Sequence, residues 1–551
     1  MGACVTPRAV GSSVQSDQGD TVDESNVAMS TGPGEVSFPV SPGPRGYSAV
    51  GAMASPSAGS ASLAQAARRL VSFPVLMGVL LIGVALIGVR ARLPDPDTWW
   101  HIAVGQQILA THSWPSSDSY SFTAAGGHWI AYEWLGEIAM ALAAHAGLVG
   151  LAALLMGLVA VVTGLLYHYA YLRSGNAKAA CLATGILLPV GAAVFSLRPQ
   201  MLGYSFLLLT LVCLEHFRQG RTRWLWVLPP LFLVWVNTHG TFAFGLVLIG
   251  LEWASGLVSF RIGGLTAERW TEKQRLQLSV TFLLCLIAVC VTPYGSELAA
   301  YPVQMATAQP VNIASIQEWQ PVSFGLALGK YLLGVLLLLF LGHVVFPLKY
   351  RLQELAMLLF GVYAACVHVR FILIFVMFLA PILAGILARW IRPYDPARDR
   401  YFLNLAVILL AVVSLARFFP GRAELGRVVA KDYPVGAVEY LRQHPQPTRM
   451  FNEYGYGGYL IWQLGPERKV FIDGRADLYE YSGVLTDYLR IANLDRDALS
   501  LLNKYSVQSC LVDRASPLAT LLSVSPGWKQ VYSDSLSAIF VRPSGTTDSG
   551  N

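Results

Sequence analysis

Long apolar segments, most of them close to 20 residues, constrain the fold of this chain more than any other feature. An α-helix needs about 20 apolar residues to cross the hydrocarbon core of a bilayer. The 551-residue chain is 54% hydrophobic and only 13% charged, whereas about 25% of the residues of a soluble domain are charged. The sequence therefore predicts an α-helical polytopic membrane protein with about eleven transmembrane helices. The expected spans are residues 71–91, 149–172, 178–197, 201–217, 224–238, 241–259, 277–293, 329–347, 352–368, 371–388 and 401–417.

The connections between these spans alternate in charge along the chain. Positively charged loops stay in the cytoplasm, so the N-terminus is expected inside and the C-terminus outside the cytoplasmic membrane of a bacterium. The basic residues of the cytoplasmic side are Arg68, Arg69, Arg173, Lys178, Arg218, Arg221, Arg223, Arg261, Arg269, Lys273, Arg275, Lys349, Arg351, Arg389, Arg392, Arg398 and Arg400. Those of the opposite side are Arg90, Arg92, Arg198, Lys330 and Arg370. The net charge of +6 is not gathered on one soluble face, so nucleic acid is not an expected partner.

Composition divides the chain into domains. Residues 1–66 are rich in Ser, Gly, Pro and Val and predict a disordered cytoplasmic tail. Residues 67–420 form the transmembrane domain, whose first outside loop, 92–148, is too long for a simple connector. Residues 421–545 predict a small α/β domain outside the membrane, followed by a tail at 546–551. The seven cysteines are scattered and predict neither a zinc site nor a disulfide framework.

Local patterns predict the elements of both outside regions. In the first loop, one helix is expected from Thr98 to about Ala110 and a second over "YEWLGEIAMALAAHAG". In the C-terminal domain, helices are expected over "YPVGAVEYLRQHP", "TDYLRIANL" and "DALSLLNKYS", and strands over "RKVFIDG", "VQSCLVD", "WKQVYSD" and "SAIFVRP". A glycine-rich turn before a helix is expected at "NEYGYGGYLIW", which lacks the Lys-Ser/Thr of a Walker loop.

Ionisable and polar residues gather at the outer ends of the spans. Such residues are costly at membrane depth and often mark function. They come from six separate outside segments: Asp95, Asp97 and His101, then Glu133, Arg198 with Gln200, Asn237 with His239, Glu318, and His368 with Arg370. Because all of them belong to one side of the membrane, they predict a shared outside site.

The acidic pair in "LPDPDTWWH" has two interpretations. Asp97 precedes a helical run and can cap its N-terminus. Asp95 and Asp97 also lie two residues apart on an extended segment and point to the same side. There they can act as a base with a helper, or share a divalent cation such as Mg²⁺ or Mn²⁺. The tryptophans that follow fit sugar stacking and interface anchoring equally well.

The other candidates also have structural interpretations. Glu133 complements the dipole of the helix that it opens, and His239 fits a turn between two spans. Arg198 fits an interface position as well as a lipid phosphate, for which arginine is suited. In "FIDGRADLY", Asp473 and Arg475 predict either a ligand site at a strand end or a structural turn.

Several ordered motifs of the chain resemble one family. They are "DPDTWWHIAVGQQIL", "PSSDSYSFTAAGGHWIAYEWLGE", "RPQ", "WVNTHG", "IQEWQP" and "GGYLIW…VFIDGRADLY". With the predicted topology, they resemble the GT-C fold of membrane glycosyltransferases over roughly residues 70–545, close to an uncharacterised bacterial subgroup. The tryptophans and His101 after the acidic pair depart from the usual pattern of the family.

The resemblance implies transfer of a sugar from a polyprenyl-phosphate donor to an envelope lipid, glycan or protein, with inversion. It assigns the base to Asp97 first and to Asp95 second. From their shared outside position, the other candidates are expected to bind substrate: Glu133, Arg198, His239, Glu318, Arg370 and His101. One alternative is an inactive relative that binds lipid-linked glycan or scaffolds envelope assembly. A transporter of a lipid-linked substrate is a second alternative, although the chain shows no inverted repeat.

Overall fold

The computed structural model describes residues 65–93 and 95–543. Except for residues 65 and 66, the predicted N-terminal tail lies outside the described residues, as does the tail predicted at 546–551. The fold class predicted from the sequence is confirmed, because apolar helices dominate the chain and a small sheet follows near its C-terminus.

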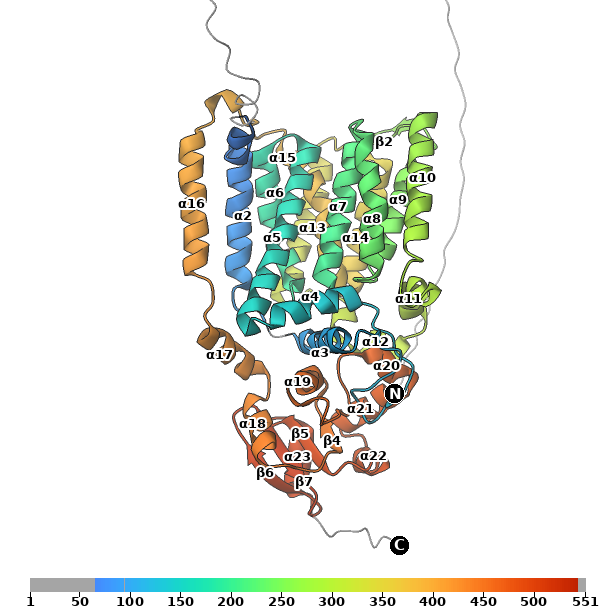
Figure 1. Ribbon diagram of the computed structural model, residues 1–551. Coiled ribbons are helices and arrows are strands. Elements are labelled where there is room, and N and C mark those ends of the chain that lie inside the picture. Colours follow the sequence, from blue (N-terminus) through green and yellow to red (C-terminus); the bar gives the residue numbers. More distant parts are fainter. Residues whose placement is uncertain (1–64, 94, 544–551) are drawn as a thin grey trace, which may run out of the picture. The chain divides into compact units, whose positions relative to one another are not determined.

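A helix lies in each of the eleven ranges predicted to span the membrane, and these helices run side by side in Figure 1. They are α2 (Phe73–Val89), α5 (Gly147–Ser174), α6 (Ala177–Gly191), α7 (Gln200–Arg218), η2 (Thr222–Val227) with α8 (Leu228–Val236), α9 (Phe242–Ser255), α10 (Glu272–Ala288), α13 (Ala327–Val345), α14 (Leu352–Val367), α15 (Ile372–Leu387) and α16 (Tyr401–Arg417). Within the described residues, six helices are long and apolar enough to cross a membrane, or up to seven if α16 and α17 form one bent span. The remaining helices, including α8, α9 and α14, are shorter or more polar.

The first outside loop contributes two helices, α3 (Pro96–Thr111) and α4 (Trp134–Ala144), which lie across the end of the bundle (Figure 1). The N-cap of α3 is Asp95, whose Oδ1 accepts a hydrogen bond from the amide of Asp97 at 3.0 Å. The cap predicted for Asp97 is therefore wrong, since Pro96 already occupies the first turn. The two helices pack closely, because a Cβ at Gly105 would lie 2.1 Å from the Glu137 carbonyl oxygen.

A second outside segment connects α10 to α13. It folds into α11 (Ser296–Thr307), α12 (Pro310–Ser315) and the 3-10 helix η3 (Gln317–Trp319). The first amides of α12 donate to the Glu480 carboxylate of the C-terminal domain, from Val311 at 2.9 Å and from Asn312 at 2.8 Å. Further 3-10 turns are η1 (Ala192–Val194), η4 (Val369–Phe371) and η5 (Pro396–Arg398).

The C-terminal domain surrounds a four-stranded sheet of order β4-β5-β7-β6, in which only the β4–β5 pair is parallel. Its strands are β4 (Met450–Asn452), β5 (Ser509–Asp513), β6 (Lys529–Ser533) and β7 (Ser537–Val541). Its helices are α17 (Arg422–Asp432), α18 (Val435–Gln443), α19 (Tyr454–Leu464), α20 (Ala476–Tyr481), α21 (Val484–Ala492), α22 (Ala498–Lys504) and α23 (Pro517–Val524). The predicted strands at β5, β6 and β7 and helices at α18, α21 and α22 are confirmed.

Two predicted elements of this domain are wrong. "RKVFIDG" forms only an isolated bridge, in which Val470 pairs with Ser121 of the first outside loop. "NEYGYGGYLIW" is not a turn, because helix α19 begins at Tyr454 and includes the glycines. The glycines serve close packing: a Cβ at Gly458 would lie 2.5 Å from the Pro96 carbonyl oxygen, so α19 lies directly against the start of α3.

The tryptophans of α3 do not anchor the helix in the bilayer interface. Trp99 is completely buried and stacks on Trp462 of α19 with 4.9 Å between ring centroids. Trp100 is 3% exposed, and its Nε1 donates to Asp97 Oδ1 at 3.2 Å. Both side chains therefore hold the acidic pair against the C-terminal domain.

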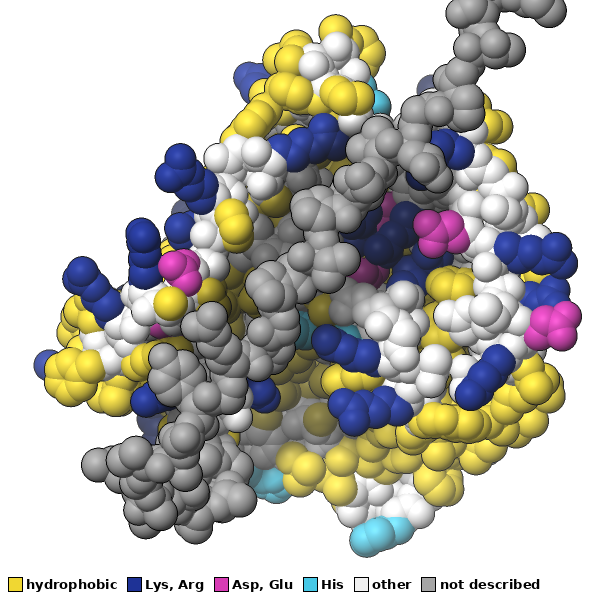
Figure 2. All heavy atoms as spheres, turned by 90° about the horizontal axis from the view of Figure 1, so that it is seen from above, with side chains coloured by type: hydrophobic (Ala, Val, Ile, Leu, Met, Phe, Trp, Pro, Cys, Tyr) yellow, Lys and Arg dark blue, Asp and Glu magenta, His cyan; other side chains and the backbone are white. Residues whose placement is uncertain are grey.

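The bundle end opposite the C-terminal domain is basic. Figure 2 shows Lys and Arg side chains gathered over its visible part, with few Asp and Glu. A small sheet of order β1-β2-β3, not predicted from the sequence, is formed by β1 (Phe260–Ile262), β2 (Leu265–Ala267) and β3 (Tyr350–Arg351).

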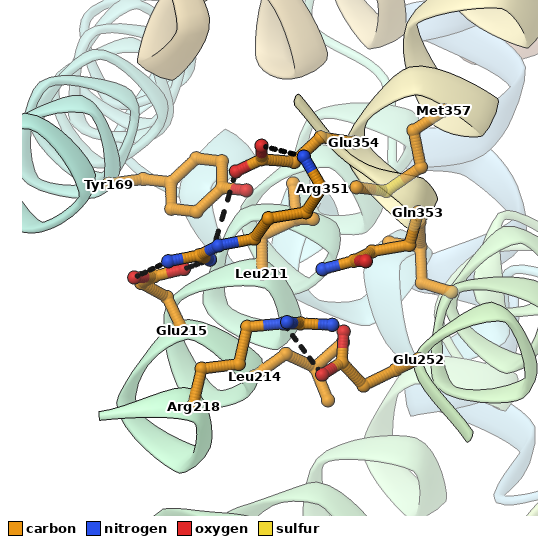
Figure 3. A pocket seen from close by; sticks show the side chains of 11 residues that line it. Tyr169, Leu211, Leu214, Glu215, Arg218, Glu252, Arg351, Gln353, Glu354 and Met357 are labelled. Atoms are coloured by element: carbon orange, nitrogen blue, oxygen red, sulfur yellow. Dashed lines mark hydrogen bonds and ion pairs between the residues drawn. The ribbon is translucent and has the colours of Figure 1, made fainter. Parts of the chain in front are cut away.

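Below this basic surface, arginines pair with glutamates of the bundle (Figure 3). Arg351 contacts Glu215 at 2.6 Å, and Arg218 contacts Glu252 at 2.7 Å. These contacts tie α7 to α9 and to the start of α14. Because each arginine already has a carboxylate partner, we interpret these ion pairs as structural contacts that hold the helices together.

Candidate functional site

A cavity of about 1220 Å³ opens where the bundle meets the outside segments and the C-terminal domain. Of the polar residues predicted to share an outside site, all but Asn237 line this cavity: Asp95, Asp97, His101, Glu133, Arg198, Gln200, His239, Glu318, His368 and Arg370. The acidic pair and His101 belong to the start of α3, and Glu133 directly precedes α4. Arg198 and His239 lie in the connections before α7 and α9, while Glu318 and Arg370 belong to η3 and η4. The structure thus brings together segments that lie up to 275 positions apart, from Asp95 to Arg370.

Arg198 is the centre of the acidic part of the site. Its Nε contacts Asp95 Oδ1 at 2.7 Å, and its Nη1 lies 3.0 Å from both Asp97 Oδ2 and Glu318 Oε2. The side chain of Arg198 is only 17% exposed. One guanidinium therefore holds three carboxylates from two separate outside segments.

Arg370 is the second cation of the site and has fewer partners. Its Nη1 lies 3.3 Å from Glu318 Oε1, and its guanidinium stacks 4.2 Å from the centre of the Trp319 ring. The Tyr204 hydroxyl donates to the Arg370 carbonyl oxygen at 3.0 Å and fixes the backbone there. Trp319 thus supports one face of the guanidinium while several of its N–H groups stay available to a ligand.

The charges of this group determine how its acids titrate. Burial raises the pKa of Asp97 to about 7, helped by Asp95 and Glu318 and opposed by Arg198. Burial also acts to raise the pKa of Glu318, but Arg370 and then Arg198 outweigh it and lower that pKa below its usual value. Asp97 therefore gains and loses a proton near neutral pH, whereas Glu318 stays ionised there.

A second group of polar residues lies beside the first. Glu133 contacts His239 Nε2 through Oε1 at 3.2 Å and His101 Nε2 through Oε2 at 3.4 Å. The other ring nitrogen of His101 lies 3.1 Å from Glu137 Oε1. Trp100 lies between the two groups. Its ring packs at a tilt against His101, with 3.6 Å between centroids, while its Nε1 donates to Asp97 Oδ1.

The divalent cation predicted at Asp95 and Asp97 does not fit their contacts. Both carboxylates already accept N–H groups from Arg198, from the Asp97 amide and from Trp100. The described residues contain no group of three or more His, Cys, Asp or Glu side chains arranged to hold a metal ion. A cation at this pair would have to displace Arg198, and no step proposed below uses a metal.

The C-terminal domain supplies a wall of the cavity that sequence reasoning did not find. Tyr454, Gly474 and Asp477 line the cavity, and Tyr301 of α11 donates to Asp477 Oδ2 at 3.3 Å. Tyr301 also stacks on Tyr132 with 4.0 Å between ring centroids. The motif "FIDGRADLY" contributes Gly474 and Asp477 to this wall, but its sequence does not show which membrane segment these residues face.

Asp473 and Arg475 of the same motif are structural. The Arg475 side chain has no exposed surface and lies between Asp473, with Nη2 at 2.7 Å, and Asp118 of the first outside loop, with Nη1 at 2.8 Å. Tyr120 and Trp129 of that loop lie around the guanidinium, their ring centres 5.0 and 4.8 Å away. Of the two interpretations open from the sequence, the buried turn is the one observed.

No family model and no curated protein matches the chain. Among solved structures, it is similar to an oligosaccharyltransferase from Archaeoglobus fulgidus tethered with an acceptor peptide, with 11% identity and a TM-score of 0.45 over 84% of this chain and 73% of that one. It is also similar to ArnT from Cupriavidus metallidurans in the apo state, with 16% identity and a TM-score of 0.45 over 87% of this chain and 98% of ArnT. The match to ArnT bound to undecaprenyl phosphate has 14% identity and a TM-score of 0.38 over 89% and 99% of the two chains.

Proposed function

We propose that this protein transfers a sugar from a polyprenyl-phosphate donor to an acceptor of the cell envelope. The observation that carries the proposal is that one cavity contains both Arg370 and Asp97. The Glu318 carboxylate connects Arg370 to Arg198, which holds Asp97, and several N–H groups of Arg370 stay available to a ligand. Sugar transfer needs these two kinds of group together: a cation for the leaving phosphate and a carboxylate for the acceptor proton.

The roles follow from the chemistry of displacement at a sugar C1. The acceptor oxygen bonds to C1 while the bond from C1 to the lipid phosphate breaks, through an oxocarbenium-like transition state. Arg370 binds the phosphate oxygens as charge accumulates on them, and Arg198 positions the surrounding carboxylates. The resemblance assigns the acceptor proton to Asp97 first and to Asp95 second, and both carboxylates line the cavity.

The location of the site supports reaction on the outer face of the cytoplasmic membrane. The basic surface lies at the opposite end of the bundle (Figure 2), and positively charged ends stay in the cytoplasm. The cavity and the C-terminal domain are then outside, where a polyprenyl-phosphate sugar can reach the cavity from the membrane.

Binding of a lipid phosphate tests the role of Arg370. Arg370→Gln removes the charge but leaves Glu318 paired with Arg198, so the fold should survive. Because a hydrogen bond to a charged group contributes about 1.5–3 kcal/mol, we expect undecaprenyl phosphate to bind the variant roughly 10- to 150-fold more weakly. Binding is measured by native mass spectrometry or fluorescence competition on the full-length protein in nanodiscs.

The matched control is Lys330→Gln, which removes an exposed outside cation at the start of α13. It should bind undecaprenyl phosphate like the wild type. Equal binding by Arg370→Gln and wild type would contradict the assigned phosphate site. Transfer is then followed as incorporation of labelled sugar into the envelope fraction of vesicles that contain the protein; binding without any incorporation would favour the inactive, scaffolding alternative.

A further inference from the structure

Four buried side chains form a line of contacts, and all but the first of them line the cavity: Glu137, His101, Glu133 and His239. Their side chains are 1%, 3%, 9% and 10% exposed, respectively. Among the ion pairs of the described residues, Glu133 and Glu137 contact only histidines, whereas Asp95, Asp97 and Glu318 all contact arginine. The positions of the protons in this line follow from its hydrogen bonds.

The proton of His239 is fixed by Thr241. The Thr241 amide donates to His239 Nδ1 at 3.0 Å, so Nδ1 carries no hydrogen. The Thr241 hydroxyl, which accepts from Trp235 Nε1 at 3.0 Å, lies 3.1 Å from the same nitrogen and can donate to it as well. The imidazole hydrogen is therefore on Nε2, the nitrogen that lies 3.2 Å from Glu133 Oε1.

The protons around His101 follow from the buried end of the line. Glu137 Oε2 is buried without a hydrogen-bond partner. An unpaired oxygen costs less free energy on a neutral carboxylic acid than on a carboxylate. Glu137 therefore carries a proton and donates it to His101 Nδ1, so the His101 hydrogen is on Nε2, which lies 3.4 Å from Glu133 Oε2. Each Glu133 carboxylate oxygen thus lies within 3.4 Å of the hydrogen-bearing nitrogen of a neutral imidazole.

From this arrangement we infer that Glu133 is the residue that takes the acceptor proton in the proposed reaction, while Asp97 serves to position Arg198. The inference rests on the proposed function. A carboxylate paired with a guanidinium is a weakened base, because the cation stabilises its ionised form. Asp97 has that pairing and Glu133 does not.

The step balances as a single proton transfer coupled to substitution. The acceptor O–H bond breaks and its proton passes to a carboxylate oxygen of Glu133, while the acceptor oxygen bonds to C1. The electron pair of the broken C1–O bond goes to the lipid phosphate, beside Arg370. The two neutral imidazoles lie against the Glu133 carboxylate, and Glu137 keeps the His101 hydrogen on Nε2, the nitrogen nearer Glu133.

The pH dependence of Glu133 agrees with this role. Burial raises its pKa to about 8; Arg370 and Arg198 lower that pKa, and Asp97 and Asp477 raise it. Burial lowers the pKa of His239 to about 3 and that of His101 well below its usual value, so both imidazoles stay neutral. The base form of Glu133 therefore increases as pH rises through about 8, and transfer should increase with it.

Two glutamine substitutions test the inference, because they have opposite expected effects. Glu133→Gln cannot take a proton, and we expect sugar incorporation to fall by about 10²- to 10⁴-fold, with undecaprenyl phosphate binding within about 3-fold of wild type. Glu137→Gln keeps an N–H donor facing His101 Nδ1, so we expect it to retain activity within about 10-fold and to keep the rise in activity near pH 8. A merely structural role of the line would make the two substitutions equally harmful.

The matched control is Glu297→Gln, at an exposed glutamate that contacts His128; it should behave as wild type. Infrared titration of protonated carboxyl groups gives a readout that needs no substrate. One band should disappear as pH rises through about 8 and be absent from Glu133→Gln, and another should persist and be absent from Glu137→Gln.

Three results separate the inference from the function on which it rests. If Asp97→Asn abolishes incorporation and Glu133→Gln does not, Glu133 is not the base and the proposed function still holds. If the infrared band of Glu137 titrates in the neutral range, the deduced proton order is overturned. If wild-type protein neither binds undecaprenyl phosphate nor transfers sugar, the proposed function fails, and the base role assigned to Glu133 fails with it.

Discussion

Replacing Arg475 by Met should unfold the connection between the first outside loop and the C-terminal domain. The substitution leaves the carboxylates of Asp118 and Asp473 buried, without exposed surface and without a cation. Removing one partner of a buried ion pair costs about 3–5 kcal/mol. We therefore expect the variant to lose folded protein at a temperature well below that of wild type, measured by size-exclusion chromatography after heating in detergent.

Arg490→Met is the control for this prediction. Arg490 also lies within 4.0 Å of three aspartates, Asp487, Asp495 and Asp497, but its side chain is 44% exposed. Exposed ion pairs contribute about 0–1 kcal/mol, so this variant should melt close to wild type. If both variants melt alike, burial does not decide the contribution of Arg475, and the motif "FIDGRAD" is not the structural link assigned to it.

The helices of the bundle could be predicted because each has a local sequence pattern that does not depend on the rest of the chain. An apolar run of the right length predicts a helix whatever its neighbours are, and each of the eleven predicted ranges contains one. The strand predicted at "RKVFIDG" failed because its partner is a single residue of a distant loop, Ser121. The turn predicted at Gly457 and Gly458 failed because these glycines serve packing against α3 and not a change of chain direction.

The candidate site could be predicted as a set of residues but not as an arrangement. Except for Asn237, the polar residues at the outer span ends do line one cavity, because alternating loop charge identifies the side on which each one lies. Their partners could not be predicted. Arg198 binds three carboxylates, and Glu137, inside the apolar run of α4, lies behind His101. These contacts depend on how α3, α4 and the bundle pack, which no local pattern contains.

Gly474 shows how closely the C-terminal domain participates in the site. A Cβ at this position would lie 1.8 Å from Asp97 Oδ1 and 2.9 Å from Trp100 Nε1. Gly474→Ala must therefore displace the Asp97 carboxylate or the backbone beside it, although it removes no charged or polar group. Since displacement of a reacting geometry by about 1 Å can cost about 100-fold in rate, we expect incorporation of labelled sugar to fall by about that factor.

Gly455→Ala is the matched substitution, because a Cβ at Gly455 in the first turn of α19 meets no atom within 4 Å. It should leave sugar incorporation unchanged and can stabilise the helix slightly, since alanine favours the helical state over glycine. If Gly474→Ala instead has wild-type activity, the C-terminal domain does not constrain Asp97 in the working enzyme. A loss confined to Gly474→Ala would mean that the soluble domain is part of the site, because its backbone sets the position of a membrane-domain carboxylate.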